Sequence, residues 1–466
     1  MQPRTRTIFV LALLGAAACG NATHRDPDGG KLDPTDAAAS TDGPAGDAGA
    51  DSGIPIPAGS IVSGAVVDAI GVPQGQVTVE IAGQLVVTGS DGRFSVQAPA
   101  AFPFDVRVSS RYDVSAVLPP QPPRRIGALF VGVERLDPTL MLPFEGRKAS
   151  GPRAMGQING GLAGLGRPSD ATSGIVISPL GIGNAGVTTY SALTGWALVS
   201  PTDTSRSTAV RIAYWKGMGE TISFLAMGKS ADQTINNGQT VTNVNITTAA
   251  ASSAPLSASL TASSTFTSLK SLVSIGLGDF TFTPWEANKP LAGATTISMP
   301  VPQLDEASYD LSLLARVSAD DTSGRQVHLV ARKLAPGADL GAVALPDPPA
   351  LAEPGDAAIV PLSGTAFRLT QAESHVRVYA FDYDDVGVFV ISAAEQIAFP
   401  DLSPVSITTP TSGTAVGWRV TSYAEASVAA ALGPRGYTGA SADRTSIPAG
   451  EVRIEGSSER RTLMVQ

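Results

Sequence analysis

Cysteine, histidine and charged residues are all scarce in this sequence. Its 466 residues include one cysteine and three histidines, and only 16% are Asp, Glu, Lys or Arg. A single cysteine cannot form an intrachain disulfide, and a zinc site of the usual kind needs about three or four His, Cys or carboxylate ligands at close spacing. The sequence therefore excludes a disulfide framework, and we expect no metal site built from histidine and cysteine.

Positive charge is scarcer than negative charge. The sequence has 32 Lys and Arg residues against 41 Asp and Glu residues, a formal net charge of -9 and a pI near 5.0. Proteins that hold nucleic acid by its phosphates need a basic face. Past the N-terminal segment no run of Lys or Arg is longer than two residues. Nucleic acid is therefore excluded as a partner.

Familiar catalytic patterns are missing as well. No serine lies in a Gly-x-Ser-x-Gly elbow, so that class of hydrolase has no nucleophile here. Residues Met227–Ser230 end like a phosphate loop, but Ser223 replaces its first glycine and a turn sequence follows instead of a helix. The glycine-rich run Gly156–Gly164 does not lead from a strand into a helix and predicts a strand edge and loop. His328 and His375 lie in alternating strands and are expected at the surface or hydrogen-bonded. We predict no catalytic residue, no cofactor and no enzymatic activity.

Long apolar runs are absent after the N-terminus, so we expect no membrane-spanning helix there. The N-terminal run Ile8–Ala18 is itself shorter than the roughly 20 residues that a spanning helix needs. Arg4 and Arg6 precede this run and small residues close it, which is the pattern of an export signal. The sequence therefore predicts a signal peptide over residues 1–18.

The end of this signal resembles a bacterial lipobox. The residues Ala16-Ala17-Ala18-Cys19 fit the site at which lipoprotein signal peptidase cuts before a lipid-modified cysteine, except that Ala16 occupies the place usually held by leucine. The resemblance implies that the Cys19 thiol carries a diacylglycerol, which would hold the chain on a membrane. The alternative is an ordinary signal peptidase site that happens to leave an N-terminal cysteine.

Residues 19–57 consist mostly of Gly, Ala, Ser, Pro and Asp and have little apolar surface to bury. This composition predicts a disordered tether. As a flexible coil the tether would span about 35 Å on average, enough to carry a folded part beyond lipid headgroups. A pro-segment of a secreted protein would have the same composition, so the tether is compatible with anchoring and with secretion.

Residues 60–96 alternate between apolar and polar positions and are interrupted by turn-forming residues. The strand Val62–Asp68, the loop Gly71–Pro73 and the Asp-Gly hairpin within Thr88–Phe94 follow one another in this order. In these elements the chain resembles the carboxypeptidase regulatory-like family, a small β-sandwich related to Cna-B and prealbumin-like modules. The resemblance implies such a sandwich over residues 58–146. It implies little about activity, because these modules serve as spacers, stalks and adhesion supports.

The same pattern of short strands and turn residues continues to the C-terminus. We predict further β-sandwiches over residues 147–252, 253–352 and 353–466, with small-residue or proline-rich spacers at 249–255 and 346–355. Proline and glycine interrupt nearly every window long enough for a helix. The expected fold class is all-β, with tandem β-sandwich modules after a signal peptide and a disordered tether.

One segment of the last predicted module is a candidate site. Asp382, Asp384 and Asp385 lie beside a glycine between two strong strands, where they offer oxygen ligands to Ca2+ or form only a hairpin turn. Tyr383 and Trp418 would form a sugar-stacking platform if they are exposed, and otherwise belong to the core.

These observations predict a lipid-anchored protein of the bacterial cell envelope, at the outer membrane and the cell surface. We expect it to be non-catalytic and to act as a structural or adhesive stalk. The alternative is a surface protein that binds carbohydrate or peptide, with a Ca2+ site in the last module. The expected partners are the membrane, through lipid on Cys19, and an envelope polysaccharide or protein.

Overall fold

Strands make up nearly all of the regular structure. The computed structural model describes residues 53–112, 124–143, 153–197, 204–278, 280–291, 293–317, 324–370, 376–424, 428–433, 435–438 and 446–466. Within these ranges the helical elements are α1 (Val428–Ala431), η1 (Gly219–Thr221) and η2 (Ser403–Val405), so the all-β prediction is confirmed. No helix in the described part is long and apolar enough to cross a membrane. The predicted signal peptide, Cys19, most of the tether and His375 lie outside the described residues.

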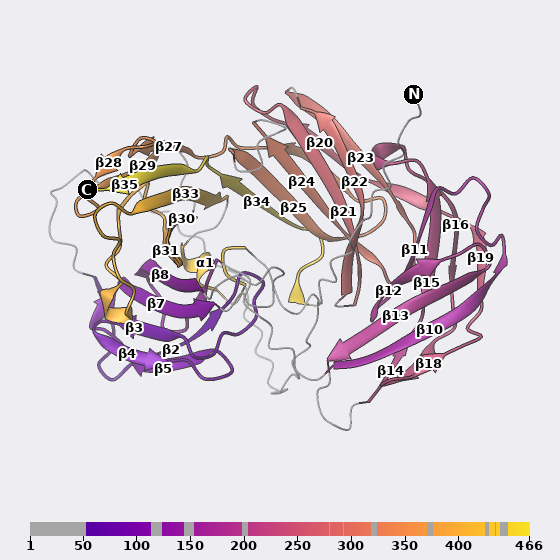
Figure 1. Ribbon diagram of the computed structural model, residues 1–466, viewed down its shortest axis with the longest axis horizontal. Coiled ribbons are helices and arrows are strands. Elements are labelled where there is room, and N and C mark those ends of the chain that lie inside the picture. The colour runs from indigo at the N-terminus through magenta and orange to yellow at the C-terminus, as the bar shows by residue number, and fades with distance from the viewer. Residues whose placement is uncertain are drawn as a thin grey trace, which may run out of the picture.

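The first unit, residues 53–143, is a two-layer sandwich (Figure 1). One layer holds β5, β2 and β9, and the other holds β8, β7, β3 and β4. The bounds are β2 Ile61–Val67, β3 Thr78–Ile81, β4 Gln84–Val87, β5 Arg93–Gln97, β7 Phe104–Tyr112, β8 Arg124–Val133 and β9 Thr139–Met141. Alternate side chains such as Val62 and Val66 of β2, and Val106 and Val108 of β7, are buried between the layers. The strands predicted from the alternation are therefore formed.

The fold begins before the predicted end of the tether. β1 (Ile54–Pro55) pairs with β6 (Ala101–Phe102), and the side chain of Ile56 is buried in the core of the first unit. An isoleucine that can be covered gains free energy by leaving water, even when its neighbours are small. The prediction of a tether through Pro57 was wrong for these last residues.

The predicted Asp-Gly hairpin at residues 89–92 is a turn of a different kind. β4 pairs with β3 and β5 pairs with β2, so the turn passes from one layer of the sandwich to the other. Gly92 has a φ of 73°, and a Cβ at this position would lie 2.6 Å from the carbonyl oxygen of Val66. The turn therefore requires glycine, as predicted, but it does not join two paired strands.

The second unit, residues 153–250, is a sheet that closes on itself. β10 pairs with β13 on one side and with β19 on the other, and the sheet runs from β13 through β12, β11, β15 and β16 back to β19. The interior is filled by apolar side chains that include Ile158, Trp196 and Tyr214. The bounds are β10 Arg153–Gly164, β11 Ser173–Ser178, β12 Gly181–Ala185, β13 Thr189–Ala197, β14 Ser205–Thr208, β15 Arg211–Lys216, β16 Ser223–Lys229, β17 Gln233–Asn236, β18 Thr240–Val241 and β19 Ile246–Ala250.

Two glycine-containing runs of this unit lie within strands. Met227–Lys229 is the end of β16, so the phosphate-loop interpretation is excluded. Gly156–Gly164 belongs to β10, which is paired on both sides, and the prediction of a strand edge and loop was wrong. Glycine is needed there because a Cβ on Gly160 would lie 1.7 Å from the carbonyl oxygen of Val244.

The third unit (residues 253–345) and the last unit (residues 350–466) are also two-layered. In the third, β23, β20 and β26 cover β22, β21, β24 and β25, and in the last, β27, β29 and β32 cover β34, β33, β30 and β31. The bounds are β20 Ser253–Thr261, β21 Ser268–Leu277, β22 Phe280–Pro290, β23 Ala294–Pro302, β24 Ser308–Arg316, β25 Gln326–Leu334, β26 Asp339–Ala344, β27 Ala350–Glu353, β28 Ile359–Val360, β29 Ala366–Thr370, β30 Val376–Tyr383, β31 Val386–Ser392, β32 Gln396–Ala398, β33 Ala415–Tyr423, β34 Glu451–Ser457 and β35 Arg461–Val465. The spacer predicted at residues 346–355 therefore contains β27, whose Leu351 is buried in the last unit.

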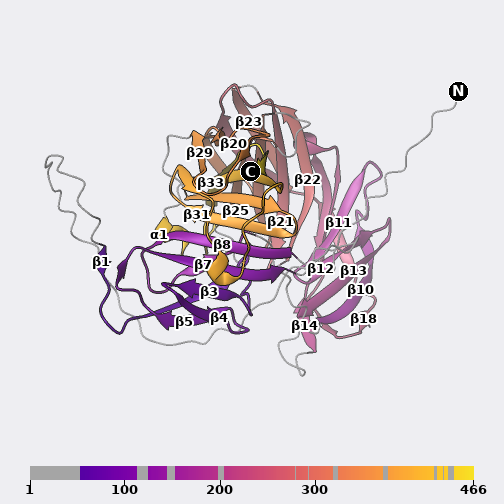
Figure 2. The same cartoon turned by 60° about the vertical axis from the view of Figure 1, so that its left-hand side comes forward.

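The units do not follow one another in space as they do in the sequence. β8 of the first unit pairs in parallel with β31 of the last, and β34 of the last unit pairs with β25 of the third. One continuous sheet therefore crosses three units, and the spatial order is first, last, third, second (Figure 1). Figure 2 shows β8 and β31 side by side. The second unit, and not the C-terminal one, lies farthest from the first.

Candidate functional site

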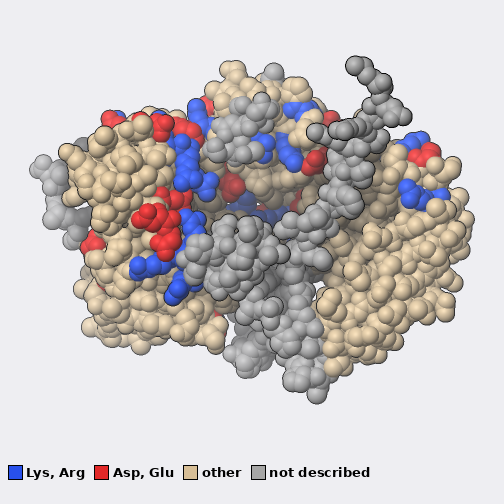
Figure 3. Space-filling view, viewed as in Figure 1, with Lys and Arg blue, Asp and Glu red and all other residues tan. Residues whose placement is uncertain are grey.

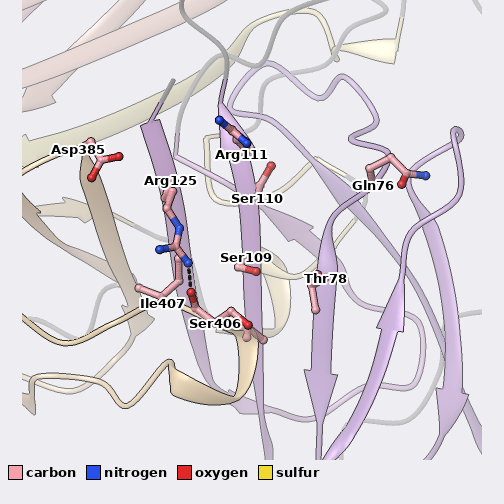
Figure 4. A pocket seen from close by; sticks show the side chains of 10 residues that line it. Gln76, Thr78, Ser109, Ser110, Arg111, Arg125, Asp385, Ser406 and Ile407 are labelled. Carbon is pink, nitrogen blue, oxygen red and sulfur yellow. Dashed lines mark hydrogen bonds between the residues drawn. The ribbon is translucent and has the colours of Figure 1, made fainter. Parts of the chain in front are cut away.

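A polar pocket lies where the first and last units meet (Figure 4). Its volume is about 390 Å3, and strands β3, β7 and β8 form one wall. The other wall comes from the tip of the β30–β31 hairpin and from residues 405–407. The residues that matter for its chemistry are Thr78, Ser109, Arg111, Arg125 and Asp385. We call this cavity the inter-unit pocket.

Sheet register brings two arginines together in this pocket. Arg111 of β7 and Arg125 of β8 are directly opposite each other in the antiparallel pair, so their side chains leave the sheet on the same face. Like charges in such a pair repel unless a counter-charge or hydrogen-bond acceptor is near. The Arg125 guanidinium donates to the carbonyl oxygen of Ser406, whereas no hydrogen bond or ion pair joins the side chain of Arg111 to another described residue. Arg111 therefore offers its donors to a ligand.

Hydroxyl groups extend the same face of the sheet. Ser109 precedes Arg111 by two positions on β7. Thr78 of β3 is directly opposite Ser109 in the antiparallel pairing of β3 with β7. Side chains two residues apart on a strand point to the same side, so both hydroxyls lie in line with the arginine pair. Figure 4 shows Ser109 and Thr78 along one wall of the pocket. The wall thus offers guanidinium and hydroxyl donors.

The opposite wall is a short arm of the last unit, residues 401–407, held against the first unit. Arg107 donates from Nε to the carbonyl oxygen of Asp401 at 3.0 Å, and its Nη1 forms an ion pair of 2.8 Å with the buried Glu80. Gly127 leaves space for the arm, because a Cβ there would lie 2.6 Å from Cδ1 of Leu402. The arm is therefore fixed by contacts with β7 and β8, and the pocket is preformed.

The three predicted calcium ligands do not converge on one point. Asp384 and Asp385 are the two residues of a tight hairpin, with Tyr383 and Val386 paired at its base and a φ of 46° at Asp384. The carboxylate of Asp382 lies 3.5 Å from Arg124 and 3.6 Å from Arg460. No group of three or more His, Cys, Asp or Glu side chains in the described part is placed to hold a metal ion. The arrangement is that of a hairpin turn whose charge is balanced by arginines.

The predicted sugar-stacking platform is not formed. The side chains of Trp418 and Tyr383 are only 1% and 5% exposed. The Trp418 ring packs against Phe367 with centroids 5.1 Å apart, and the Tyr383 hydroxyl donates to the carbonyl oxygen of Thr408 at 2.7 Å. Burial raises the pKa of Tyr383 to about 12. Both rings belong to the core of the last unit, which was the alternative to a binding role.

A serine, a histidine and a glutamate that sequence reasoning did not connect lie in a row across β24, β25 and β34. Ser312 Oγ is 2.5 Å from His328 Nε2, and His328 Nδ1 is 3.1 Å from Glu455 Oε1. The order matches the nucleophile, base and acid of a hydrolase. No signal in the sequence joins them, because they come from three separate strands. His328 is a strand residue whose ring is hydrogen-bonded to side chains of the two neighbouring strands, which agrees with the prediction of a hydrogen-bonded strand histidine.

This row lacks the donors that acyl transfer needs. Ser312 is in the middle of β24, which is paired with β21 on one side and β25 on the other. The neighbouring backbone N–H groups are therefore used in the sheet and cannot form an oxyanion hole. Among the described residues, the row is best understood as a hydrogen-bonded network on a sheet face.

Comparisons with known proteins give no family. No family model and no curated protein matches the chain. Among solved structures, a leucine-rich repeat protein from Bacteroides thetaiotaomicron is 10% identical over 42% of this chain and 26% of its own, with a TM-score of 0.16. A proposed adhesin from Bacteroides ovatus is 8% identical over 35% of this chain and 72% of its own, with a TM-score of 0.12. The chain thus spans about a quarter of the first of these proteins, and neither likeness carries an argument about function.

Proposed function

We propose that this chain is a lipid-anchored, non-catalytic protein of the bacterial cell envelope that adheres to an anionic envelope polysaccharide. The lipobox-like sequence at Cys19, the acidic tether and the all-β architecture support the anchor and the structural role. The observation that carries the adhesive role is the arginine pair of the inter-unit pocket.

An oxyanion is the ligand that this pocket fits best. Guanidinium groups bind phosphate and carboxylate through parallel N–H donors, and charge-assisted bonds of this kind are roughly twice as strong as neutral ones. Arg111 and Arg125 provide such donors from one face, and the hydroxyls of Thr78 and Ser109 are beside them. Asp385 on the rim favours a ligand that also presents a hydroxyl donor, as a sugar does.

A further support is the connection between this pocket and the rest of the fold. Residues of both the first and the last unit line the pocket. The sheet that joins these two units continues into the third unit. A ligand held there is attached to one rigid sheet and not to a flexible string of domains. This makes the protein better suited to bear force between a membrane and a polysaccharide than to act as an extended stalk.

The anchor is tested by Cys19→Ser. We expect this variant to leave the membrane fraction for the soluble envelope fraction or the medium, because two or more acyl chains are needed for stable anchoring. Mass spectrometry of the mature wild-type N-terminus should find a diacylglycerol on Cys19. Retention of the variant at the membrane, or an unmodified first residue in the wild type, would overturn the lipid anchor.

The binding role is tested by Arg111→Gln, with Arg93→Gln as the matched control. Arg93 is an exposed arginine of the same unit, on β5 and outside the inter-unit pocket. Calorimetric titration with inorganic phosphate and with an oligogalacturonate separates the two sources of an oxyanion. We expect Arg111→Gln to weaken the affinity for whichever of the two ligands binds more tightly by about tenfold or more, because one charge-assisted bond is lost. Equal binding by both variants, or no binding of either ligand to the wild type, would refute the role.

A further inference from the structure

A second groove lies on the outer face of the second unit, across β10, β12 and β13 and beside residues 242–245. Its volume is about 700 Å3. Five amide side chains line it: Gln157, Asn159, Asn184, Asn243 and Asn245. We call it the amide groove. It shares no residue with the inter-unit pocket, and it lies on the unit farthest from the first.

The strand register aligns the polar groups of the amide groove. Asn159 of β10 and Asn184 of β12 are each directly opposite Ser191 of β13, so the three side chains form one row across three strands. Gln157 donates from Nε2 to Asn159 Oδ1 at 2.9 Å and to Ser191 Oγ at 2.8 Å. These bonds fix the orientation of the Asn159 amide, which leaves its Nδ2 donors to face a ligand.

The segment 242–245 forms a fixed wall of the groove. The Val244 backbone N–H donates to the Asn159 carbonyl at 3.2 Å, and the buried Tyr190 hydroxyl donates to the Val244 carbonyl at 2.7 Å. Asn245 Oδ1 accepts a bond of 3.0 Å from the Gly161 N–H. The wall is therefore held before any ligand arrives, which lowers the entropy cost of binding.

Charge is absent from this face. The sequence has no Asp, Glu, Lys or Arg at positions 154–166, 171–202 or 233–269, which include the groove residues. In Figure 3 the surface over β10 and β13 is without blue or red side chains. A charged ligand would lose its hydration there without gaining a counter-charge, so the groove favours a neutral one.

Apolar side chains continue the same face beyond the amides. Met155 and Leu193 are 62% and 54% exposed, and each points outward on the strand that carries Gln157 or Ser191. The face therefore combines hydrogen-bonding groups with exposed CH groups. A sugar ring has the matching surfaces, with hydroxyls at its edge and CH groups on its faces.

We infer that the amide groove binds a neutral oligosaccharide. Each Asn or Gln side chain offers both a donor and an acceptor, which suits hydroxyls that donate and accept in turn. The binding goes beyond the proposed adhesion to an anionic polysaccharide and uses a different site and a different ligand class. The two sites together would let one chain contact two kinds of glycan.

The test is a glycan array that carries neutral, uronic acid-containing and phosphorylated oligosaccharides, probed with the full chain in detergent. We expect neutral glycans to bind and Asn184→Ala to weaken that binding by about tenfold, the loss of one or two hydrogen bonds. Asn236→Ala is the control, because Asn236 is an exposed amide of the same unit on β17, outside the groove. Asn184 is exposed, so the melting temperature of both variants should match the wild type.

The outcomes separate this inference from the proposed function. Arg111→Gln should leave binding to neutral glycans unchanged, and Asn184→Ala should leave binding to phosphate or oligogalacturonate unchanged. Failure of every neutral glycan to bind would overturn the amide groove as a sugar site. So would binding that survives Asn184→Ala, or that is found only for the uronic acid-containing or phosphorylated glycans.

Discussion

Trp215 of the second unit and Trp285 of the third meet edge to face, with ring centroids 5.6 Å apart and planes at 75°. Phe224 completes the contact at 5.2 Å from Trp285. All three rings are buried in one hydrophobic core that includes strands of both units. The second unit therefore packs against the third through these aromatic rings, and we expect the two units to unfold together.

Trp285→Ala should remove the centre of this contact. Loss of a buried tryptophan costs about 3–5 kcal/mol, because apolar contacts are lost and the cavity is only partly refilled. We expect the urea midpoint to fall by a corresponding amount, and the transition of the second unit to separate from that of the third. Met218→Ala, which removes an exposed side chain of the second unit, is the control. A midpoint for Trp285→Ala equal to that of the control would contradict the shared core.

Glu306 should make this interface sensitive to acid. Its carboxylate is 2.5 Å from Nη2 of the buried Arg211 and 3.3 Å from Nζ of Lys229. The hydrogen bond from Lys229 and the charge of Arg211 hold the pKa of Glu306 below its ordinary value of 4.5. A lowered pKa in the folded state means that the stabilisation is complete above 4.5 and is lost as the pH falls through the folded value.

Glu306→Gln is the direct test of that acid dependence. As the pH falls through the window below 4.5, the wild type should lose more stability than the variant, and above that window the variant should be the less stable of the two. The difference between the two proteins in the free energy of unfolding should stay below about 1 kcal/mol, because the carboxylate is mostly exposed and screened by solvent. Urea midpoints measured across this pH window test the prediction. If the midpoints of the two proteins change in parallel with pH, Glu306 is not the source of the acid sensitivity.

How much of this fold can be predicted from the sequence depends on how far apart along the chain the paired residues lie. The strand at Val62–Asp68 and the glycine requirement at Gly92 are local, because alternation and turn chemistry involve neighbouring residues. The parallel pairing of β8 with β31 joins residues 125–130 to residues 386–391, and no local pattern indicates it. The continuous sheet was therefore not predictable from strand patterns alone.

The candidate sites show the same division. Asp384 and Asp385 form the turn that their composition indicates, but the arginines that balance Asp382 come from β8 and from the end of the chain. Whether Trp418 is exposed depends on which layer covers its strand, and the sequence does not state this. The pairing of Arg111 with Arg125 needs the register of β7 and β8, which a strand prediction does not provide.

The junction of the first and last units can be tested by a disulfide. Leu129 of β8 is the partner of Val390 of β31, and both side chains lie in the core of the last unit. Paired strands are about 4.8 Å apart, which is within the range of Cα separations that a disulfide bridges. In a Cys19→Ser background, which removes the only native cysteine, Leu129→Cys with Val390→Cys should oxidise to an intrachain bond found by peptide mass spectrometry.

The control for this crosslink shifts one residue by a single position. Leu129→Cys with Ile391→Cys places the second thiol on the opposite face of the sheet, because consecutive strand residues alternate. Ile391 packs in the core of the first unit and not in that of the last. We expect no crosslink in this variant. Equal crosslinking of both pairs would contradict the register of the junction and with it the spatial order of the units.

Gly160→Ala should destabilise the closed sheet of the second unit. A Cβ at this position would lie 1.7 Å from the Val244 carbonyl oxygen and 2.8 Å from the Tyr190 ring, so the backbone of residues 242–245 must move. Overpacking of this kind typically costs about 1–3 kcal/mol. Gly355→Ala is the control, because nothing lies within 4 Å of its added Cβ. Thermal unfolding should show a lower midpoint for Gly160→Ala only.

Because the moved segment is also a wall of the amide groove, binding of neutral glycans should weaken in the same variant while phosphate binding does not change. A variant with native stability would show that β10 and this segment are not held together as described.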